Sequence, residues 1–206
     1  MTLKIIVPPH PLIAHWLSIL RTESTPNSIY VTALEELGKW LTYEAIRDWL
    51  PCRTEIIKTS LGQTEGSIIE SRIPLLAIPN LPGGLQLWNG ARNILPNTEL
   101  SLGGKIPPQI KKNAGIILYF DEISTGDLLI KNLISLKEQN IEPQRIKIIS
   151  IISSNPGLKK ISELFPELTI YAACIDPEIT EEGRIIPGIG VTESRINTTI
   201  SDSFSF

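Results

Sequence analysis

Residues 115–127 read Gly-Ile-Ile-Leu-Tyr-Phe-Asp-Glu-Ile-Ser-Thr-Gly-Asp, an apolar run that ends in two acids and a Thr-Gly turn. The continuous apolar stretch 116–120 predicts a strand buried on both faces of a parallel sheet. After the turn, leucines recur at three- and four-residue intervals from Leu129 to Leu136, which is the spacing of a helix. This stretch therefore predicts the central strand of a sheet, followed by a helix that starts where the acids and the turn lie.

The same alternation continues on both sides of this stretch. The predicted strands are 54–61, 73–79, 146–152 and 170–175, and the predicted helices are 11–20, 31–50 and 158–165, with turns at 62–66 and 153–157. Strand, helix and strand within about thirty residues make a βαβ unit. The fold class is therefore α/β, with a mostly parallel central sheet flanked by helices. Ligands of such sheets bind outside the carboxyl ends of the strands, so the loops there should share one cleft.

The composition fits one domain, residues 1–206, and excludes several kinds of partner. Lys and Arg number 19 against 22 Asp and Glu, a net charge of -3, so the chain lacks the basic surface that nucleic acid or an anionic membrane would require. The apolar run in the first seven residues is too short for a signal peptide or a spanning helix. We expect a cytoplasmic protein that binds neither nucleic acid nor membrane.

The cysteines and histidines do not form a metal-binding pattern. Cys52 and Cys174 lie far apart in the sequence, and His10 and His15 are five residues apart rather than the four of a helical metal pair. We expect buried or incidental thiols, structural histidines and no metal held by the protein alone.

The acids and the turn after the central strand have a specific chemical use. Backbone N–H groups and hydroxyls at a helix N-terminus, here Ser124, Thr125 and Gly126, can bind a phosphate. Carboxylates at the strand end, Asp121 and Glu122, can accept hydrogen bonds from ribose hydroxyls. The alternative is an ordinary helix start with Ser124 or Asp127 as its cap.

Gly83 and Gly84 directly follow the predicted strand 73–79 and its Asn80-Leu81-Pro82 extension. Glycines let the backbone turn tightly and approach a ligand that side chains would exclude. The alternative is a plain strand-to-helix turn, and the Gly-Gly pair alone favours that reading.

Several segments, in order along the chain, resemble uracil phosphoribosyltransferases. Residues 120–127 resemble the phosphoribosyl diphosphate loop of type I phosphoribosyltransferases. The other matching segments are His10-Pro11-Leu12-Ile13, His15, Leu20-Arg21, Leu41-Thr42-Tyr43-Glu44-Ala45, Asn155-Pro156-Gly157-Leu158, Phe165-Pro166-Glu167-Leu168, Tyr171, Ile175-Asp176 and Gly183-Arg184-Ile185-Ile186-Pro187-Gly188-Ile189-Gly190.

The resemblance implies a type I phosphoribosyltransferase fold, commonly a homodimer, that converts uracil and phosphoribosyl diphosphate to UMP and diphosphate in pyrimidine salvage. Mg²⁺ would enter only with the phosphoribosyl diphosphate. By position, Asp121 and Glu122 would be the catalytic acids facing the ribose. The implied phosphoribosyl diphosphate site comprises Ser124, Thr125, Gly126, Asp127, Gly83 and Gly84, and the implied uracil site comprises Ile185, Gly190, Val191 and Thr192.

Four departures from the family pattern predict weak or lost activity. Asp127 and Leu128 stand where the family has Gly and a hydroxyl residue, and like charges about 4 Å apart repel by about 4 kcal/mol at an effective dielectric of ~20. Pro82 replaces an arginine of the diphosphate loop, and Val191 replaces an acid. The family's arm between Gly90 and the central strand is expected to be shortened.

The loop is also one residue shorter than the family's, so either Phe120 or Asp121 stands at its first acidic position. Two readings remain open: a pentosyl transferase with altered groups, and a non-catalytic nucleobase- or nucleotide-binding regulatory or scaffold protein. A domain with no small-molecule ligand is a third.

Overall fold

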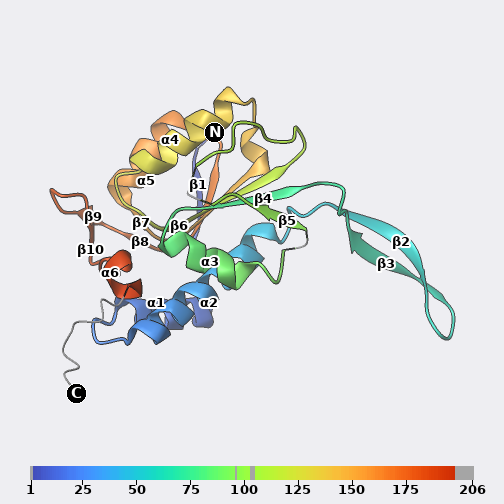
Figure 1. Cartoon of the computed structure of the whole chain (residues 1–206), viewed down its shortest axis with the longest axis horizontal. Coiled ribbons are helices and arrows are strands. Elements are labelled where there is room, and N and C mark those ends of the chain that lie inside the picture. The colour runs from blue at the N-terminus through green and yellow to red at the C-terminus, as the bar shows by residue number, and fades with distance from the viewer. Residues whose placement is uncertain (1, 96, 103–104, 198–206) are drawn as a thin grey trace, which may run out of the picture.

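A six-stranded parallel sheet forms the centre of the molecule in the computed structural model, which describes residues 2–95, 97–102 and 105–197 (Figure 1). Every neighbouring pair of strands in it runs parallel. In spatial order the strands are β1 (Lys4–Ile6), β8 (Thr169–Asp176), β7 (Ile146–Ser154), β6 (Gly115–Ile123), β4 (Leu75–Pro79) and β5 (Thr98–Leu100). The predicted α/β class and the mostly parallel sheet are confirmed.

The apolar run after Gly115 forms β6, between β4 and β7, as its composition predicts. The strand does not end at Phe120, because Glu122 and Ile123 still pair with Ile152 and Ser153 of β7. The two acids are therefore part of a paired strand rather than of a loop, and their backbone is held by the sheet.

Helices cover both faces of the sheet, in two separate apolar layers (Figure 1). The helices of one layer are α1 (Pro11–Arg21), α2 (Asn27–Ile46) and α3 (Gly83–Ala91), and those of the other are α4 (Asp127–Glu138) and α5 (Asn155–Leu164). Alternate residues of β6 supply the two layers: Tyr119 belongs to the first and Leu118 to the second. Both faces of the strand are therefore buried, as a parallel sheet requires.

A β-hairpin projects from this body (Figure 1). Its strands are β2 (Cys52–Lys58) and β3 (Gln63–Ile69). The sequence pattern predicts a turn over residues 62–66. The turn instead lies at 59–62, and Gly66 belongs to β3, where it pairs with Glu55 of β2. The segment that projects is thus this hairpin, which we call the arm, and not the stretch between Gly90 and the central strand.

The connection to β6 is a surface loop. Of the described residues between Ser101 and Ala114, none lies in a helix or strand, and Gly103 and Gly104 fall outside the described residues. Arg145, which ends a short 3-10 helix (Pro143–Arg145), donates to the Ala114 carbonyl and so holds the end of the loop. Among the described helices, none is long and apolar enough to cross a bilayer.

The carboxyl-terminal part of the chain adds a small hairpin and a short helix. The hairpin strands are β9 (Glu178–Ile179) and β10 (Ile185–Ile186), and the helix is α6 (Thr192–Ile196). Together they place residues 183–193 beside the carboxyl end of β6.

Candidate active site

A cleft of about 480 Å³ opens at the carboxyl ends of β4 and β6. Its lining residues come from three segments, 80–82, 120–129 and 184–193. The predicted site residues that line it are Asp121, Glu122, Ser124, Thr125, Gly126, Asp127, Ile185, Gly190, Val191 and Thr192. The loops after β4 and β6 therefore share one cleft, as predicted, whereas the loops directly after β7 and β8, which were expected to join them, supply no lining residue.

Gly83 and Gly84 are buried in the first turn of α3 and do not belong to the cleft lining. A Cβ at Gly83 would lie 2.5 Å from the side chain of Asp121, and one at Gly84 would lie 2.4 Å from the Tyr119 carbonyl oxygen. Both glycines are thus explained by the close packing of α3 against the end of β6. The structure favours the plain-turn interpretation over close approach to a ligand.

Asp121 is a buried acid with a defined polar partner. Its carboxylate is hydrogen-bonded to the side chain of Thr192, whose hydroxyl also lies 3.3 Å from the hydroxyl of Tyr30. Burial raises the pKa of Asp121, and the Thr192 hydrogen bond opposes that rise. The contact joins the acid at the end of β6 to the start of α6.

Glu122 lies beside Asp121 and is partly buried. Burial, reinforced by the negative charge of Asp121, raises the pKa of Glu122 to about 7, while Arg184 acts in the opposite direction. A carboxyl with that pKa is about half protonated at neutral pH. The pair can accept hydrogen bonds from hydroxyls, and either acid can ligate a cation.

Among the described residues, no cluster of three or more His, Cys, Asp or Glu side chains could hold a metal ion. Mg²⁺ is commonly bound through only one or two carboxylates together with substrate phosphates. Asp121 and Glu122 fit that mode, because both are carboxylates in the cleft. A metal here would depend on the ligand it accompanies.

The loop between β6 and α4 is held on two sides by hydrogen bonds. The Ser124 hydroxyl donates to the carbonyl of Gly183, and the Ser154 hydroxyl donates to the carbonyl of Ser124 at 2.5 Å. Gly126 has a φ of 79°, in the left-handed region that favours glycine. The Ser124 hydroxyl hydrogen is therefore already engaged within the protein.

Asp127 begins α4, and two side chains engage its carboxylate. It accepts a hydrogen bond from the Thr125 hydroxyl at 2.8 Å and an ion-pair contact from the ammonium of Lys160 on α5. Lys160 holds the pKa of Asp127 below its usual range, with help from Thr125.

The residue before α4, Gly126, has no side chain that could cap the helix, and the Thr125 hydroxyl accepts a hydrogen bond from the Asp127 N–H at 3.4 Å. Neither alternative cap, Ser124 or Asp127, therefore occupies that position. The N–H groups of Leu128 and Leu129 at the helix start remain without a capping side chain, which suits an anionic ligand.

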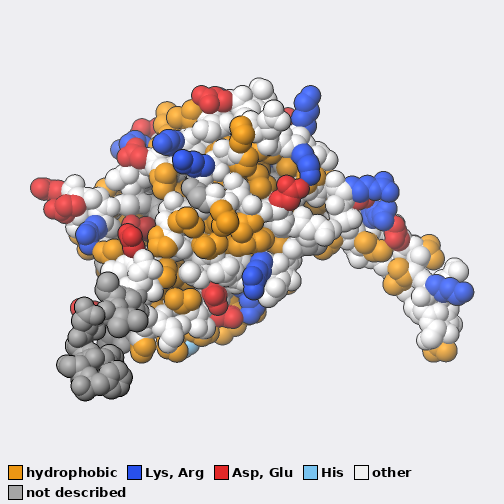
Figure 2. Space-filling model, in the orientation of Figure 1, with side chains coloured by type: hydrophobic (Ala, Val, Ile, Leu, Met, Phe, Trp, Pro, Cys, Tyr) orange, Lys and Arg blue, Asp and Glu red, His pale blue; other side chains and the backbone are white. Residues whose placement is uncertain are grey.

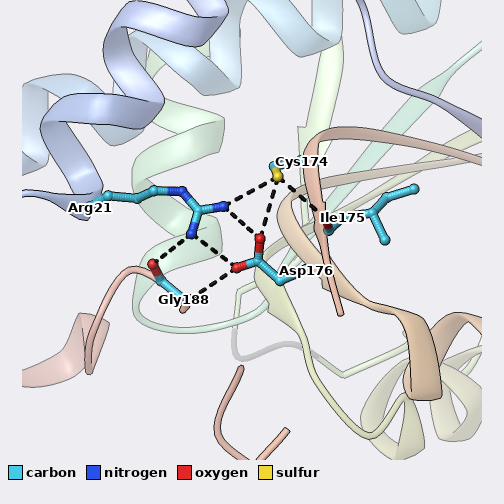
Figure 3. A network of polar contacts seen from close by, with 5 residues as sticks. All are labelled: Arg21, Cys174, Ile175, Asp176 and Gly188. Carbon is cyan, nitrogen blue, oxygen red and sulfur yellow. Dashed lines mark hydrogen bonds and ion pairs between the residues drawn. The ribbon is translucent and has the colours of Figure 1, made fainter. Parts of the chain in front are cut away.

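The loop 185–190 forms the opposite wall of the cleft. Gly188 and Gly190 have φ values of 66° and 78°, so the loop bends twice through backbone conformations that favour glycine. Gly188 is held by Arg21 and Asp176, which form an ion pair at 2.6 Å (Figure 3). Sequence reasoning gave these two residues no role, although an acid directly at the end of a buried strand was a signal that could have been followed.

The charge of the cleft lining is mainly negative. Its acids are Asp121, Glu122, Asp127 and Glu193, and Arg184 is the lining residue with a positive charge. Lys160 adds a second positive charge next to the lining, paired with Asp127.

Comparison with known proteins gives consistent results over nearly the whole chain. Residues 7–199 match the family model described as Uracil phosphoribosyltransferase. Proteins named uracil phosphoribosyltransferase include one from Synechococcus elongatus, 35% identical over 94% of this chain and 96% of its own. Another, named as chloroplastic, is from Arabidopsis thaliana and is 38% identical over 90% of this chain and 68% of its own. Among solved structures, the AQ2163 protein from Aquifex aeolicus superimposes with a TM-score of 0.80 at 25% identity, covering 95% of this chain and 98% of that one.

The raised pKa of Glu122 predicts a pH effect on stability. A folded pKa near 7 against 4.5 when exposed means that the folded state binds more protons between these values, so the free energy of unfolding falls as pH rises from 4.5 to 7. After allowance for solvent screening, we expect a contribution of roughly 1–2 kcal/mol that Glu122→Gln removes. Urea denaturation at pH 5 and pH 8 measures it.

The control for this prediction is Glu138→Gln, at the exposed end of α4. This variant should keep the wild-type difference between the two pH values. If Glu122→Gln also keeps that difference, Glu122 ionises normally in the folded protein.

Proposed function

We propose that this chain, which belongs to the uracil phosphoribosyltransferase family, keeps the family's ligand cleft but transfers the phosphoribosyl group to uracil weakly or not at all. The observation that carries the proposal is that the hydroxyls of the loop 124–127 are already hydrogen-bonded within the protein. The Ser124 hydroxyl donates to the carbonyl of Gly183, and the Thr125 hydroxyl donates to the carboxylate of Asp127. A donor phosphate would have to displace these contacts before using either hydroxyl.

In this proposal different segments of the cleft bind the phosphate, the ribose and the base. The N–H groups at the start of α4 and the loop 124–127 bind the 5-phosphate of phosphoribosyl diphosphate. Asp121 and Glu122 accept hydrogen bonds from the ribose hydroxyls. The Gly190 backbone and Ile185 contact the edge of uracil, with Val191 and Thr192 beside them.

Mg²⁺ is part of the proposal only when phosphoribosyl diphosphate is bound. It would be ligated by Asp121 or Glu122 together with the ligand's phosphates, and it would neutralise charge that develops on the diphosphate. Asp121 is held toward the cleft by Thr192, and the partial protonation of Glu122 lowers the negative charge that a phosphate has to approach.

Three positions weaken the contacts that catalysis needs. Pro82 has no positive charge for the departing diphosphate, and Val191, which is 41% exposed, offers an apolar side chain at the cleft. Asp127 brings a carboxylate to the phosphate loop, although Lys160 compensates part of its charge. The loss of a single preorganised donor typically costs about 10²–10³ in rate, so combined losses predict little turnover.

Restoring the four departing positions tests the proposal. In the variant Asp127→Gly, Leu128→Thr, Pro82→Arg and Val191→Asp, conversion of labelled uracil to UMP should rise by roughly 10²–10³-fold over the wild type. Reactions without phosphoribosyl diphosphate provide the background. A wild-type protein already as active as the restored variant would contradict weak or lost activity.

The charge of the cleft favours a second candidate function. Four acids against one arginine in the lining repel a highly anionic donor more than a neutral nucleobase. The chain would then be a non-catalytic nucleobase- or nucleotide-binding protein with a regulatory or scaffold role.

Isothermal titration separates these two functions. For the binding protein we expect heat with uracil or UMP and none with phosphoribosyl diphosphate plus Mg²⁺. Tight binding of phosphoribosyl diphosphate would instead favour the enzyme over the binding protein, since it would mean that the Asp127 carboxylate does not block the phosphate.

A homodimer built through the arm is also part of the proposal. Hydrophobic side chains lie on the surface of the projecting arm (Figure 2). They include Ile56, which is 64% exposed, and Leu61, which is 99% exposed. An isolated two-stranded hairpin is marginally stable alone in water. The same chain exposes Leu12 and Tyr43 on α1 and α2, so each copy offers both an apolar arm and an apolar face. Such a pair of surfaces is suited to a symmetric dimer.

Light scattering of the eluting protein tests the dimer. The wild type should elute at twice its 22.8 kDa, and Ile56→Asp with Leu61→Asp should shift it to the monomer mass. The control is Ile134→Asp, which places the same charge on an exposed apolar residue of α4. A monomeric wild type, or an unchanged mass in the arm variant, would contradict an arm-mediated dimer.

A cytoplasmic location belongs to the same proposal. Cys52 and Cys174 are both free, as cysteines are in a reducing compartment.

A further inference from the structure

We propose that the Arg21–Asp176 ion pair is a positioning device, which fixes the loop 185–190 in the conformation that presents its backbone to a base in the cleft. This inference rests on the proposed function, because it assigns a uracil-type base to that loop. Neither residue lines the cleft, so the pair would act through Gly188 and not by touching the ligand.

The pair joins two elements that lie far apart in the sequence (Figure 3). Arg21 is the last residue of α1, and Asp176 is the last residue of β8. Nη2 of Arg21 lies 2.6 Å from Oδ1 of Asp176, and Nη1 lies 3.0 Å from Oδ2. The two parallel contacts give this pair a fixed orientation as well as a favourable energy.

Both partners also hold the same residue of the loop. The Gly188 N–H donates to Oδ2 of Asp176 at 2.9 Å, and the Gly188 carbonyl accepts from Nη1 of Arg21 at 3.2 Å. A contact that served only to join α1 to β8 would not require either bond. Because both polar groups of Gly188 are held, the loop has little freedom to rotate about that residue.

The position of Gly188 transmits this restraint to the cleft. Gly188 is buried, and a Cβ there would lie 2.4 Å from the carbonyl oxygen of Ile185, so the loop closes tightly on itself. Ile185 and Gly190, the two residues assigned to the base, lie three residues before it and two after it. A displacement of about 1 Å at such a site can cost roughly 10²-fold in rate, so a support behind the loop can determine how well the base fits.

The surroundings of the Arg21–Asp176 ion pair restrict its movement. The side chain of Asp176 is 3% exposed and that of Arg21 is 25% exposed. Nη2 of Arg21 also contacts Sγ of Cys174 at 3.2 Å, which engages the guanidinium further. Removal of one partner of such a pair leaves the other charge buried without compensation.

The test measures two affinities in the full-length protein by calorimetric titration, one for uracil and one for ribose 5-phosphate, which the loop 124–127 would bind. In Arg21→Met we expect the uracil affinity to fall by roughly 10–100-fold, and the ribose 5-phosphate affinity to stay within about twofold of the wild type. Arg21→Lys, which keeps the charge but not the paired contact, should recover part of the loss.

Two further variants distinguish a loss of positioning from a change in folding. Arg21→Met combined with Asp176→Asn removes both charges and leaves an amide oxygen for Gly188, so no charge stays buried alone. This double variant should lose uracil affinity as Arg21→Met does. The control is Arg47→Met, which removes an ion pair of the same 2.6 Å length at the end of α2, away from the cleft lining, and should change neither affinity.

Unchanged uracil affinity in Arg21→Met would overturn the proposal, and so would an equal loss for both ligands, which would indicate a general role in folding. If the wild type binds no uracil, the proposed function fails separately, and hydrogen exchange of the peptide that contains 185–190 decides the positioning role. Exchange about 10-fold faster in the double variant than in Arg47→Met would support it. Equal exchange in the two would overturn it.

Discussion

The structure depends on the parallel pairing of β6 between β4 and β7. Because both faces of this strand are covered, its side chains must be apolar up to the edge of the sheet, and they supply the two apolar layers alternately. The two carboxylates of the strand come near its carboxyl end, where it reaches the cleft. Asp121 and Glu122 stand at that point, still held by the hydrogen bonds of the sheet. The fixed position of these acids at the cleft is thus a consequence of the strand pairing.

The same packing explains the two glycines in the first turn of α3, behind the cleft lining. The first turn of α3 lies so close to β6 that a side chain at Gly83 would meet Asp121, and one at Gly84 would meet the backbone of Tyr119. These glycines maintain the position of the acid. The acid in turn is desolvated, which raises its pKa and, through its charge, that of Glu122. Helix packing and the charge state of the cleft are therefore linked by the same few atoms.

Sequence patterns were sufficient for the order of elements from β6 to β8 and for placing the acids beside the Thr-Gly turn, whereas the loop 185–190 was assigned to the same site only through the resemblance to uracil phosphoribosyltransferases. These features follow from apolar periodicity and from the rule that ligands bind at the carboxyl ends of parallel strands. The strand β1 was not predicted, because three residues carry too little periodicity. The direction of the Asp127 side chain could not be predicted either, since it depends on Lys160, which lies on another helix. The pairing of Arg21 with Asp176 spans 155 positions in the sequence, and only the folded chain brings the two together.

The hydrogen bond from Ser124 to the Gly183 carbonyl connects the two walls of the cleft. A serine hydroxyl has one hydrogen to donate, so it can serve either Gly183 or a ligand oxygen, but not both at once. Gly183 lies shortly before β10, the strand with which the loop 185–190 begins. A ligand oxygen that accepted this hydrogen would therefore remove a contact that holds the turn before the opposite wall. If a ligand on one side took this hydrogen and thereby changed the affinity on the other side, thermodynamic linkage would make the influence equal in both directions.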